Sequence, residues 1–185
     1  MKIYTRGGDG GETSVWGGRR LAKDDARIEA IGAVDECNAA VGAALADGLP
    51  ADVAAILRTA QGRLFVVGSE LMAPDRTGPG SGLPRLAEGD VAGLESSIDA
   101  LVASLPELRN FILPGGTPAA AALHLARAAS RRAERRVTSL RRTGDVPSVV
   151  AAYLNRLADL LFVAARATNA AAGVPDAVWS GRETA

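Results

Sequence analysis

The spacing of apolar residues predicts an all-α protein, a five-helix up-down bundle. Five long segments repeat apolar residues at helical intervals, and stretches containing Gly or Pro separate them. No alternating strand pattern of convincing length occurs anywhere in the chain. Helices joined by short connections pack as antiparallel neighbours, so an up-down arrangement follows. Alanine-rich faces let helices approach closely, and we expect some of these faces to bury against another copy.

The first two helices are predicted over residues 24–46 and 51–73. Asp24 or Asp25 can cap the first helix, and Gly48 and Pro50 follow its end. Its expected core stripe consists of Ile28, Ile31, Val34, Val41 and Leu45. The corresponding stripe of the second helix consists of Val53, Ile56, Leu57, Leu64, Val67 and Leu71. Residues 74–84, rich in Gly, Pro and Ser, should then form a mobile connection.

Three further helices are predicted over residues 88–104, 117–142 and 147–172. Proline bounds the third on both sides, and a Thr-Pro pair is a typical start signal for the fourth. The fifth should bury an apolar side formed by Val150, Leu154, Leu157, Leu161 and Val163 or Ala164. We therefore expect one domain, residues 1–185, comprising a glycine-rich loop (1–23), the bundle (24–172) and a C-terminal tail (173–185).

Composition limits the kinds of partner. The formal net charge is zero, so no overall field would attract nucleic acid or an anionic membrane, and an anion site must be local. The polar, glycine-rich N-terminus differs from a signal peptide, and no apolar run approaches membrane-spanning length. One cysteine, Cys37, and one histidine, His124, exclude a disulfide framework and a cysteine-based zinc site. These features indicate a soluble cytoplasmic protein.

The fourth predicted helix carries an unusual row of arginines. Arg127, Arg131 and Arg135 are each four residues apart and share one face, with His124 above them. Like charges at this spacing repel, so the row needs an anion or a carboxylate nearby. A phosphate site is one interpretation, and a solvated helix face is the other.

The N-terminal segment contains glycines at positions 7, 8, 10 and 11, followed by Thr13 and Ser14. Backbone N–H groups in such a segment can approach phosphate oxygens closely. The spacing matches neither the dinucleotide fingerprint nor a Walker A loop. A phosphate loop and a disordered terminus both remain open on this pattern.

Polar residues also interrupt two apolar helical patterns. Asp35 and Glu36 stand in the first predicted helix, where a carboxylate can be solvated or can anchor an arginine of another helix or subunit. Asn155 and Asp159 stand in the fifth, facing a site, an interface or the arginines of the fourth helix. The simplest structural alternative is a helix-to-helix ion pair between Asp159 and an arginine.

Three separated motifs together resemble one family. The stretches KIYTRGGDGGETSVWGGRRLAKDDARIEAIGAVDECNAAVG, FILPGGTPAAAALHLARAASRRAERR and YLNRLADLLFVAAR are similar to those of the PduO-type ATP:cob(I)alamin adenosyltransferases, over essentially the whole chain. The resemblance implies a homotrimeric five-helix bundle with active sites between adjacent subunits. It also implies transfer of the 5′-deoxyadenosyl group of ATP to Co(I) of reduced cobalamin, which gives adenosylcobalamin and triphosphate. Because Co(I) is the nucleophile, no protein nucleophile is expected.

The resemblance assigns a set of ATP contacts and Mg²⁺ bound with the nucleotide. These contacts are Thr5, Arg6, Gly7, Gly8, Thr13, Lys23, Arg131, Glu134, Arg135 and Asn155. Gly7 departs from the pattern, because the family usually has Thr there. Arg131, Glu134 and Arg135 match the helix that holds the polyphosphate, where Glu134 could orient arginines or reach the metal.

The resemblance also assigns residues to the corrinoid and to the subunit contact. Asp35 and Arg127 match a pair that joins neighbouring subunits at the active site. Phe111 matches the aromatic residue that crowds the lower corrin face and excludes the dimethylbenzimidazole ligand, which makes Co(II) easier to reduce. With Arg131 these residues form the expected catalytic set. Asp159 is a further candidate near the corrinoid, and His124 is expected to be structural.

Two other functions fit the sequence. One is a corrinoid-carrying or ATP-sensing module without turnover, and the other is a helical oligomerisation domain with solvated arginines. The combination of Arg6, Lys23, Arg131, Glu134 and Asn155 favours catalysis. The expected partners are ATP, cob(I)alamin or cob(II)alamin, a reductase and an adenosylcobalamin-dependent enzyme, with no nucleic acid and no membrane.

Overall fold

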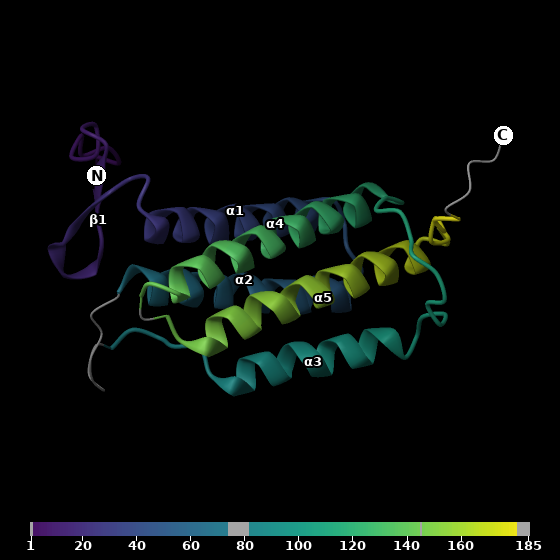
Figure 1. Ribbon diagram of the computed structural model, residues 1–185. Helices are drawn as coiled ribbons and strands as arrows, with labels where there is room; N and C mark the ends of the chain where they lie inside the picture. Colours follow the sequence, from purple (N-terminus) through teal and green to yellow (C-terminus); the bar gives the residue numbers. More distant parts are fainter. Residues whose placement is uncertain (1, 74–81, 145, 181–185) are drawn as a thin grey trace.

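The structure, a computed structural model, describes residues 2–73, 82–144 and 146–180. Five α-helices in this part of the chain run alternately up and down (Figure 1). They are α1 (Ala26–Ala46), α2 (Ala51–Met72), α3 (Glu88–Val102), α4 (Pro118–Arg141) and α5 (Ser148–Ala171). The predicted five-helix bundle is confirmed. The expected mobile connection, residues 74–84, lies outside the described residues except for 82–84, and the expected tail is described only as far as residue 180.

Side-chain caps explain where two of the helices begin. The Asp25 carboxylate accepts a hydrogen bond from the backbone N–H of Arg27 at 2.8 Å, which satisfies a donor of the first turn of α1. Thr117 does the same for α4, where its hydroxyl accepts from the N–H of Ala120 at 3.2 Å. Pro118 is the first residue of α4, where its missing N–H costs nothing.

Helix α4 lies between α1 and α5, and α3 packs on α5 (Figure 1). Helix α2 packs on α1 and makes a smaller contact with α5. The core is formed largely by leucine, valine and alanine from all five helices. Each fully buried leucine, such as Leu57, Leu123 or Leu157, contributes about 1.5–3 kcal/mol through removal of apolar surface from water.

Helix α5 is long and strongly apolar. Among the described residues it alone is long and apolar enough, by length and hydropathy, to cross a membrane. The expectation that no apolar run approaches that length is therefore wrong for residues 148–171. However, 61% of its most apolar window is buried inside the bundle, where α5 contacts α3 and α4. This burial explains the apolar composition of α5, because a helix in the centre of a bundle has apolar residues on most of its faces.

A short β-hairpin precedes α1. Strand β1 (Glu12–Ser14) pairs antiparallel with β2 (Arg20–Ala22), and a 3₁₀ turn, η1 (Trp16–Gly18), joins them. Gly17 and Gly18 adopt φ near +84° and +81°, a conformation that side chains disfavour. The sequence predicted only a loop here, because strands of three residues are too short to show alternation. The hairpin stands beside the N-terminal end of α1 (Figure 1).

Candidate active site

The arginines of α4 divide between two faces of the helix. On the face toward α1, Arg132 pairs with Glu36, and Arg136 pairs with Glu29 at 3.3 Å. These pairs confirm the interpretation that a carboxylate of the first helix anchors an arginine, with Glu36 rather than Asp35 in that role. The side chains are about half exposed, so each pair contributes little stability.

The other face of α4 lines an open hollow of about 450 Å³, which we call the arginine hollow. Its lining residues are Arg131, Glu134, Arg135, Thr138, Ser139 and Arg142. No ion pair engages its three arginines among residues 2–73, 82–144 and 146–180. Glu134 is the one carboxylate of the lining, so the hollow carries a net positive charge that suits a polyanion.

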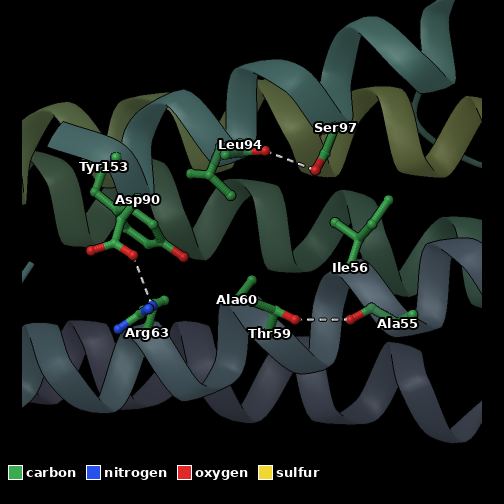
Figure 2. A pocket seen from close by; sticks show the side chains of 11 residues that line it. Ala55, Ile56, Thr59, Ala60, Arg63, Asp90, Leu94, Ser97 and Tyr153 are labelled. Carbon is green, nitrogen blue, oxygen red and sulfur yellow. Dashed lines mark hydrogen bonds and ion pairs between the residues drawn. The ribbon is translucent and has the colours of Figure 1, made fainter. Parts of the chain in front are cut away.

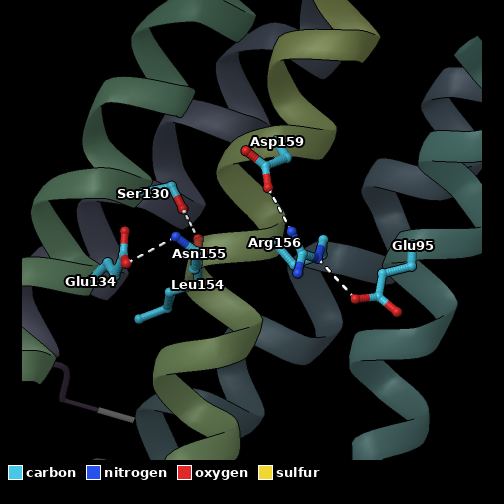
Figure 3. Close-up of polar contacts among 7 residues, drawn as sticks. All are labelled: Glu95, Ser130, Glu134, Leu154, Asn155, Arg156 and Asp159. Carbon is cyan, nitrogen blue, oxygen red and sulfur yellow. Dashed lines mark hydrogen bonds and ion pairs between the residues drawn. The ribbon is translucent and has the colours of Figure 1, made fainter.

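Asn155 connects the arginine hollow to α5. Its Nδ2 donates a hydrogen bond to Glu134 Oε1 at 3.1 Å, as Figure 3 shows. One turn away, the Ser130 hydroxyl donates to the carbonyl of Leu154 at 3.0 Å, which fixes the two helices at this point. This hydrogen bond holds the Glu134 carboxylate in place at the edge of the hollow.

Asp159 lies apart from these residues. It accepts a hydrogen bond from Arg156 Nη1 at 2.8 Å on the same helix, and Arg156 Nε contacts Glu95 of α3 at 3.0 Å (Figure 3). The alternative of a helix-to-helix ion pair is therefore wrong for Asp159 in the described chain, because its arginine lies on the same helix, α5. This follows from helix geometry, because Arg156 and Asp159 are three residues apart.

The N-terminal residues line a different hollow, of about 480 Å³. Thr13 and Lys23 lie there with Arg132, Arg136 and residues of α1. Gly8 lies close to Lys23, since a Cβ at Gly8 would come within 3.3 Å of Lys23 Nζ. A side chain at this position would crowd the lysine that the resemblance assigns to ATP.

A backbone turn over residues 6–9, closed by the N–H of Asp9 donating to the carbonyl of Arg6 at 3.3 Å, precedes the hairpin. The N–H of Gly7 donates to the Thr5 hydroxyl at 3.4 Å, and Arg6 has a positive φ of 59°, unusual for a residue with a side chain. The guanidinium of Arg6 lies 5.6 Å from the ring centroid of Tyr4. The carbonyl of Gly7 accepts a hydrogen bond from Arg20 Nη2 at 2.8 Å, which ties the turn to β2.

The expected ATP contacts therefore do not share one hollow within the chain. Thr13 and Lys23 lie on the α1 side of α4, whereas Arg131, Glu134 and Arg135 line the hollow on its other face. The reason is helical periodicity, since Arg131 and Arg132 project about 100° apart.

Asp35 and Arg127 lie on the packed helices α1 and α4. Asp35 is exposed, and Arg127 is half-buried with its Nε buried and without a hydrogen-bond partner. In the part of the chain that the structure describes, neither takes part in an ion pair.

Phe111 lies in the connection between α3 and α4, and 80% of its surface is exposed. Phe111 precedes the start of α4, whereas Arg131 is thirteen residues beyond that start, about 20 Å along the helix axis. The aromatic residue and the arginine hollow thus occupy different ends of the bundle.

His124 and Cys37 are buried between the helices. Burial lowers the pKa of His124, the positive charge of Arg127 lowers it further, and the negative charge of Asp176 raises it. Neither ring nitrogen has a hydrogen-bond partner among the described residues. The imidazole ring packs against the Phe162 ring, with the two ring centroids 6.1 Å apart, in keeping with a structural role. Burial raises the pKa of the Cys37 thiol to about 11, so this group is a poor nucleophile.

A further hollow, of about 370 Å³, separates α2 from α3 and contains none of the predicted site residues (Figure 2). An ion pair between Arg63 and Asp90, at 2.8 Å, stands at one end. The Tyr153 hydroxyl lies beneath it without a hydrogen-bond partner, and burial raises its pKa.

The sequence reasoning missed three residues of the arginine hollow, namely Thr138, Ser139 and Arg142. Arg142 is eleven residues after Arg131, which is three helical turns, so the signal was available in the spacing. Thr138 and Ser139 gave no such signal, because hydroxyl residues are common on any exposed helix face.

Comparison with known proteins shows which family the chain resembles. Residues 3–168 match the family model described as cobalamin adenosyltransferase. A corrinoid adenosyltransferase of Bacillus subtilis is 45% identical over 181 residues, covering 95% of this chain and 91% of that protein. One from Mycobacterium tuberculosis is 44% identical over 171 residues, covering 91% and 89%.

Solved structures show the same similarity. A variant PduO-type ATP:corrinoid adenosyltransferase from Lactobacillus reuteri, complexed with cobalamin and ATP, superposes with a TM-score of 0.90 at 36% identity, covering 97% of each chain. A second variant from that organism, complexed with ATP, gives a TM-score of 0.87. Since the family model spans most of the chain and the relatives match nearly its full length, the chain belongs to the cobalamin adenosyltransferase family.

Proposed function

We propose that this protein transfers the 5′-deoxyadenosyl group of ATP to Co(I) of reduced cobalamin, using the arginine hollow to hold the triphosphate. The observation that carries the proposal is that Arg131, Arg135 and Arg142 line one hollow with a single carboxylate, and none of the three forms an ion pair among the described residues. Membership of the family gives this anion site its substrate.

The reaction requires little acid–base catalysis by protein side chains. Co(I) donates an electron pair to C5′ of ATP, the Co–C bond forms as the C5′–O bond breaks, and triphosphate leaves with that bond's electrons. Arg131 and Arg135 stabilise the negative charge that develops on the leaving group. Asn155 orients Glu134 by donating a hydrogen bond to its carboxylate.

Magnesium fits the same hollow. Mg²⁺ typically binds through one or two carboxylates together with substrate phosphates, and Glu134 supplies one carboxylate. The described residues contain no group of three metal-ligating side chains that could hold the ion without ATP. When bound, the ion would neutralise part of the triphosphate charge.

The proposed active site is shared between copies of the chain in a cytoplasmic homotrimer. Support comes from Thr13 and Lys23, which lie on the other side of α4 from the arginine hollow. One nucleotide would contact both sets of residues if one set came from one chain and the other set from a neighbouring chain. Asp35 and Arg127, free of ion pairs within the described chain, would then bridge neighbouring subunits. Phe111 of one chain would face the corrinoid, with Asp159 as a second candidate contact. A reductase and an adenosylcobalamin-dependent enzyme would supply and use the cobalamin.

The test combines purified protein, ATP, Mg²⁺ and chemically reduced cobalamin. Formation of the light-sensitive adenosylcobalamin spectrum, with equimolar triphosphate, is the expected result. Binding of ATP and corrinoid without product would instead support a carrier or sensor module. Absence of thermal stabilisation by millimolar ATP would favour a plain oligomerisation domain.

The shared site has its own test. Light scattering at micromolar protein should give the mass of three chains, and Asp35→Ala should weaken both assembly and turnover. A fully active monomer would contradict the shared site while leaving the reaction intact.

A further inference from the structure

The loop that carries Phe111 is paired with the segment that follows α5. Ile112 and Val178 form an antiparallel bridge, Leu113 N–H donates to the carbonyl of Ala177 at 2.7 Å, and Trp179 N–H donates to the carbonyl of Phe111 at 2.8 Å. We call residues 174–180 the C-terminal strap. The two backbone hydrogen bonds on either side of the bridge set the register of the strap against the loop.

Helix α5 anchors both the strap and the start of the loop through one buried arginine. Arg166, only 6% exposed, donates from Nε to Asp176 at 2.7 Å and from Nη2 to the carbonyl of Pro106 at 2.9 Å. A buried guanidinium with two partners holds a fixed position, because losing Asp176 would leave its charge uncompensated and losing the Pro106 carbonyl would leave a buried N–H donor unsatisfied. The strap and the loop are therefore positioned by the same side chain.

The far end of the loop is anchored by Asn169, also on α5. Its Oδ1 accepts from the N–H of Thr117 at 2.9 Å, and its Nδ2 donates to the carbonyl of Gly115 at 3.0 Å. Gly116 between them has φ near +106°, and a Cβ there would collide with the Asn169 amide. The loop is thus held at both ends and along its middle.

This framework places the Trp179 ring against Phe111. The two rings meet edge to face, with centroids 6.5 Å apart and planes inclined at 68°. Phe111 is 80% exposed and Trp179 is 56% exposed, so they pack on one another while leaving an apolar surface open. Leu113 and Val178, each more than half exposed, extend that surface. Adjacent exposed apolar side chains on a fixed loop are typical of a binding surface.

We propose that Trp179 is a positioning residue of the corrinoid site, which holds the Phe111 ring in the orientation that excludes the lower cobalt ligand. The proposal rests on the role proposed above for Phe111. An unsupported aromatic ring on a loop samples several rotamers, whereas an edge-to-face partner on a paired strand restricts it. Displacement of the dimethylbenzimidazole base needs a ring held in place, since a mobile ring would yield to the ligand.

The test compares two corrinoids in the full-length enzyme. Cobalamin carries the dimethylbenzimidazole base, whereas cobinamide has the same corrin ring without it. Trp179→Ala should lower kcat with cobalamin about two- to tenfold, in line with the loss of one aromatic pair, and should change kcat with cobinamide less than about twofold. The fraction of ATP-bound enzyme holding cob(II)alamin without its lower ligand, read from the visible absorption spectrum, should fall as well. Trp179→Phe, which keeps a ring, should restore both readouts.

An equal loss with both corrinoids, or no loss with either, would overturn the inference. Should Trp179→Ala fold poorly by circular dichroism, Trp179→Leu keeps apolar bulk without the ring and is expected to give the same corrinoid-dependent loss. If the unmodified enzyme adenosylates neither corrinoid, the proposed function itself fails. If it adenosylates both and Trp179→Ala matches it, only the role of Trp179 fails.

Discussion

Adjacent arginines on α4 have different surroundings. Arg132 and Arg136 meet Glu36 and Glu29 of α1, while Arg131 and Arg135 face a hollow whose one lining carboxylate is held by Asn155. The residues are chemically identical, and each pair has the same spacing of four. The role of an arginine on this helix is therefore decided by what the neighbouring helix presents opposite it.

The same difference explains why Arg131 and Arg135, which line the arginine hollow, can bind a substrate. A paired arginine has already exchanged water for a carboxylate, so an incoming phosphate would have to displace that partner. An unpaired one keeps its hydrogen-bond donors available for a bidentate contact. The arginines that pair with α1 and the arginines left open to an anion therefore lie on different faces of α4.

The largest effect is expected at Arg131. Arg131→Ala should reduce kcat by about a thousandfold or more, because an arginine that stabilises charge on a transferring phosphate contributes at that scale. Steady-state formation of adenosylcobalamin measures it, and Arg131→Lys should retain only part of the rate because it cannot form a bidentate contact. Near-normal turnover in the alanine variant would remove Arg131 from the mechanism.

A matched pair of neighbours tests the two faces directly. Arg135→Ala should raise KM for ATP about tenfold, a cost typical of one charge-assisted contact to phosphate. Arg136→Ala removes the same side chain from the α1 side, and we expect less than about 1 kcal/mol loss of stability, because its ion pair with Glu29 is half exposed. ATP titration and chemical unfolding of both variants give the comparison. Equal changes in KM would show that the two faces are not distinct.

The smallest effect concerns the buried part of the same helix. His124 has a lowered pKa in the folded protein, so it is neutral there while the unfolded chain binds a proton below its ordinary pKa of about 6.5. The protein should lose stability as the pH falls from about 6.5 toward the folded pKa, and keep it above that window. His124→Leu should flatten this part of the profile in urea unfolding at pH 5.5 and 7.5. An unchanged slope would assign the pH dependence to other groups.

Much of the fold could be predicted from local patterns. Periodic apolar residues placed all five helices, and capping residues marked two starts because capping depends on adjacent residues alone. The sequence left Asp24 and Asp25 as alternatives for the first cap, of which the structure selects Asp25, and Thr117 caps α4. The strands β1 and β2 escaped prediction, since three residues cannot show a period. Asp159 was expected to pair with an arginine, yet its partner, Arg156, lies on the same helix.

The candidate site was only partly predictable. Arg131, Glu134 and Arg135 could be named because a resemblance and a helical stripe coincide there, and their use in catalysis stays a prediction. The pairing of Trp179 with Phe111 could not be foreseen, because 68 residues of chain separate them and only the strap after α5 brings them together.

By itself, then, the sequence determined the helices, their starts and the presence of a row of charge on one of them, because these depend on spacing within a few turns. The tertiary structure alone decided which arginines meet a carboxylate and which remain open, and which aromatic ring supports Phe111. The physical reason is that an ion pair or a ring contact depends on the rotation of one helix against another, which no local pattern specifies.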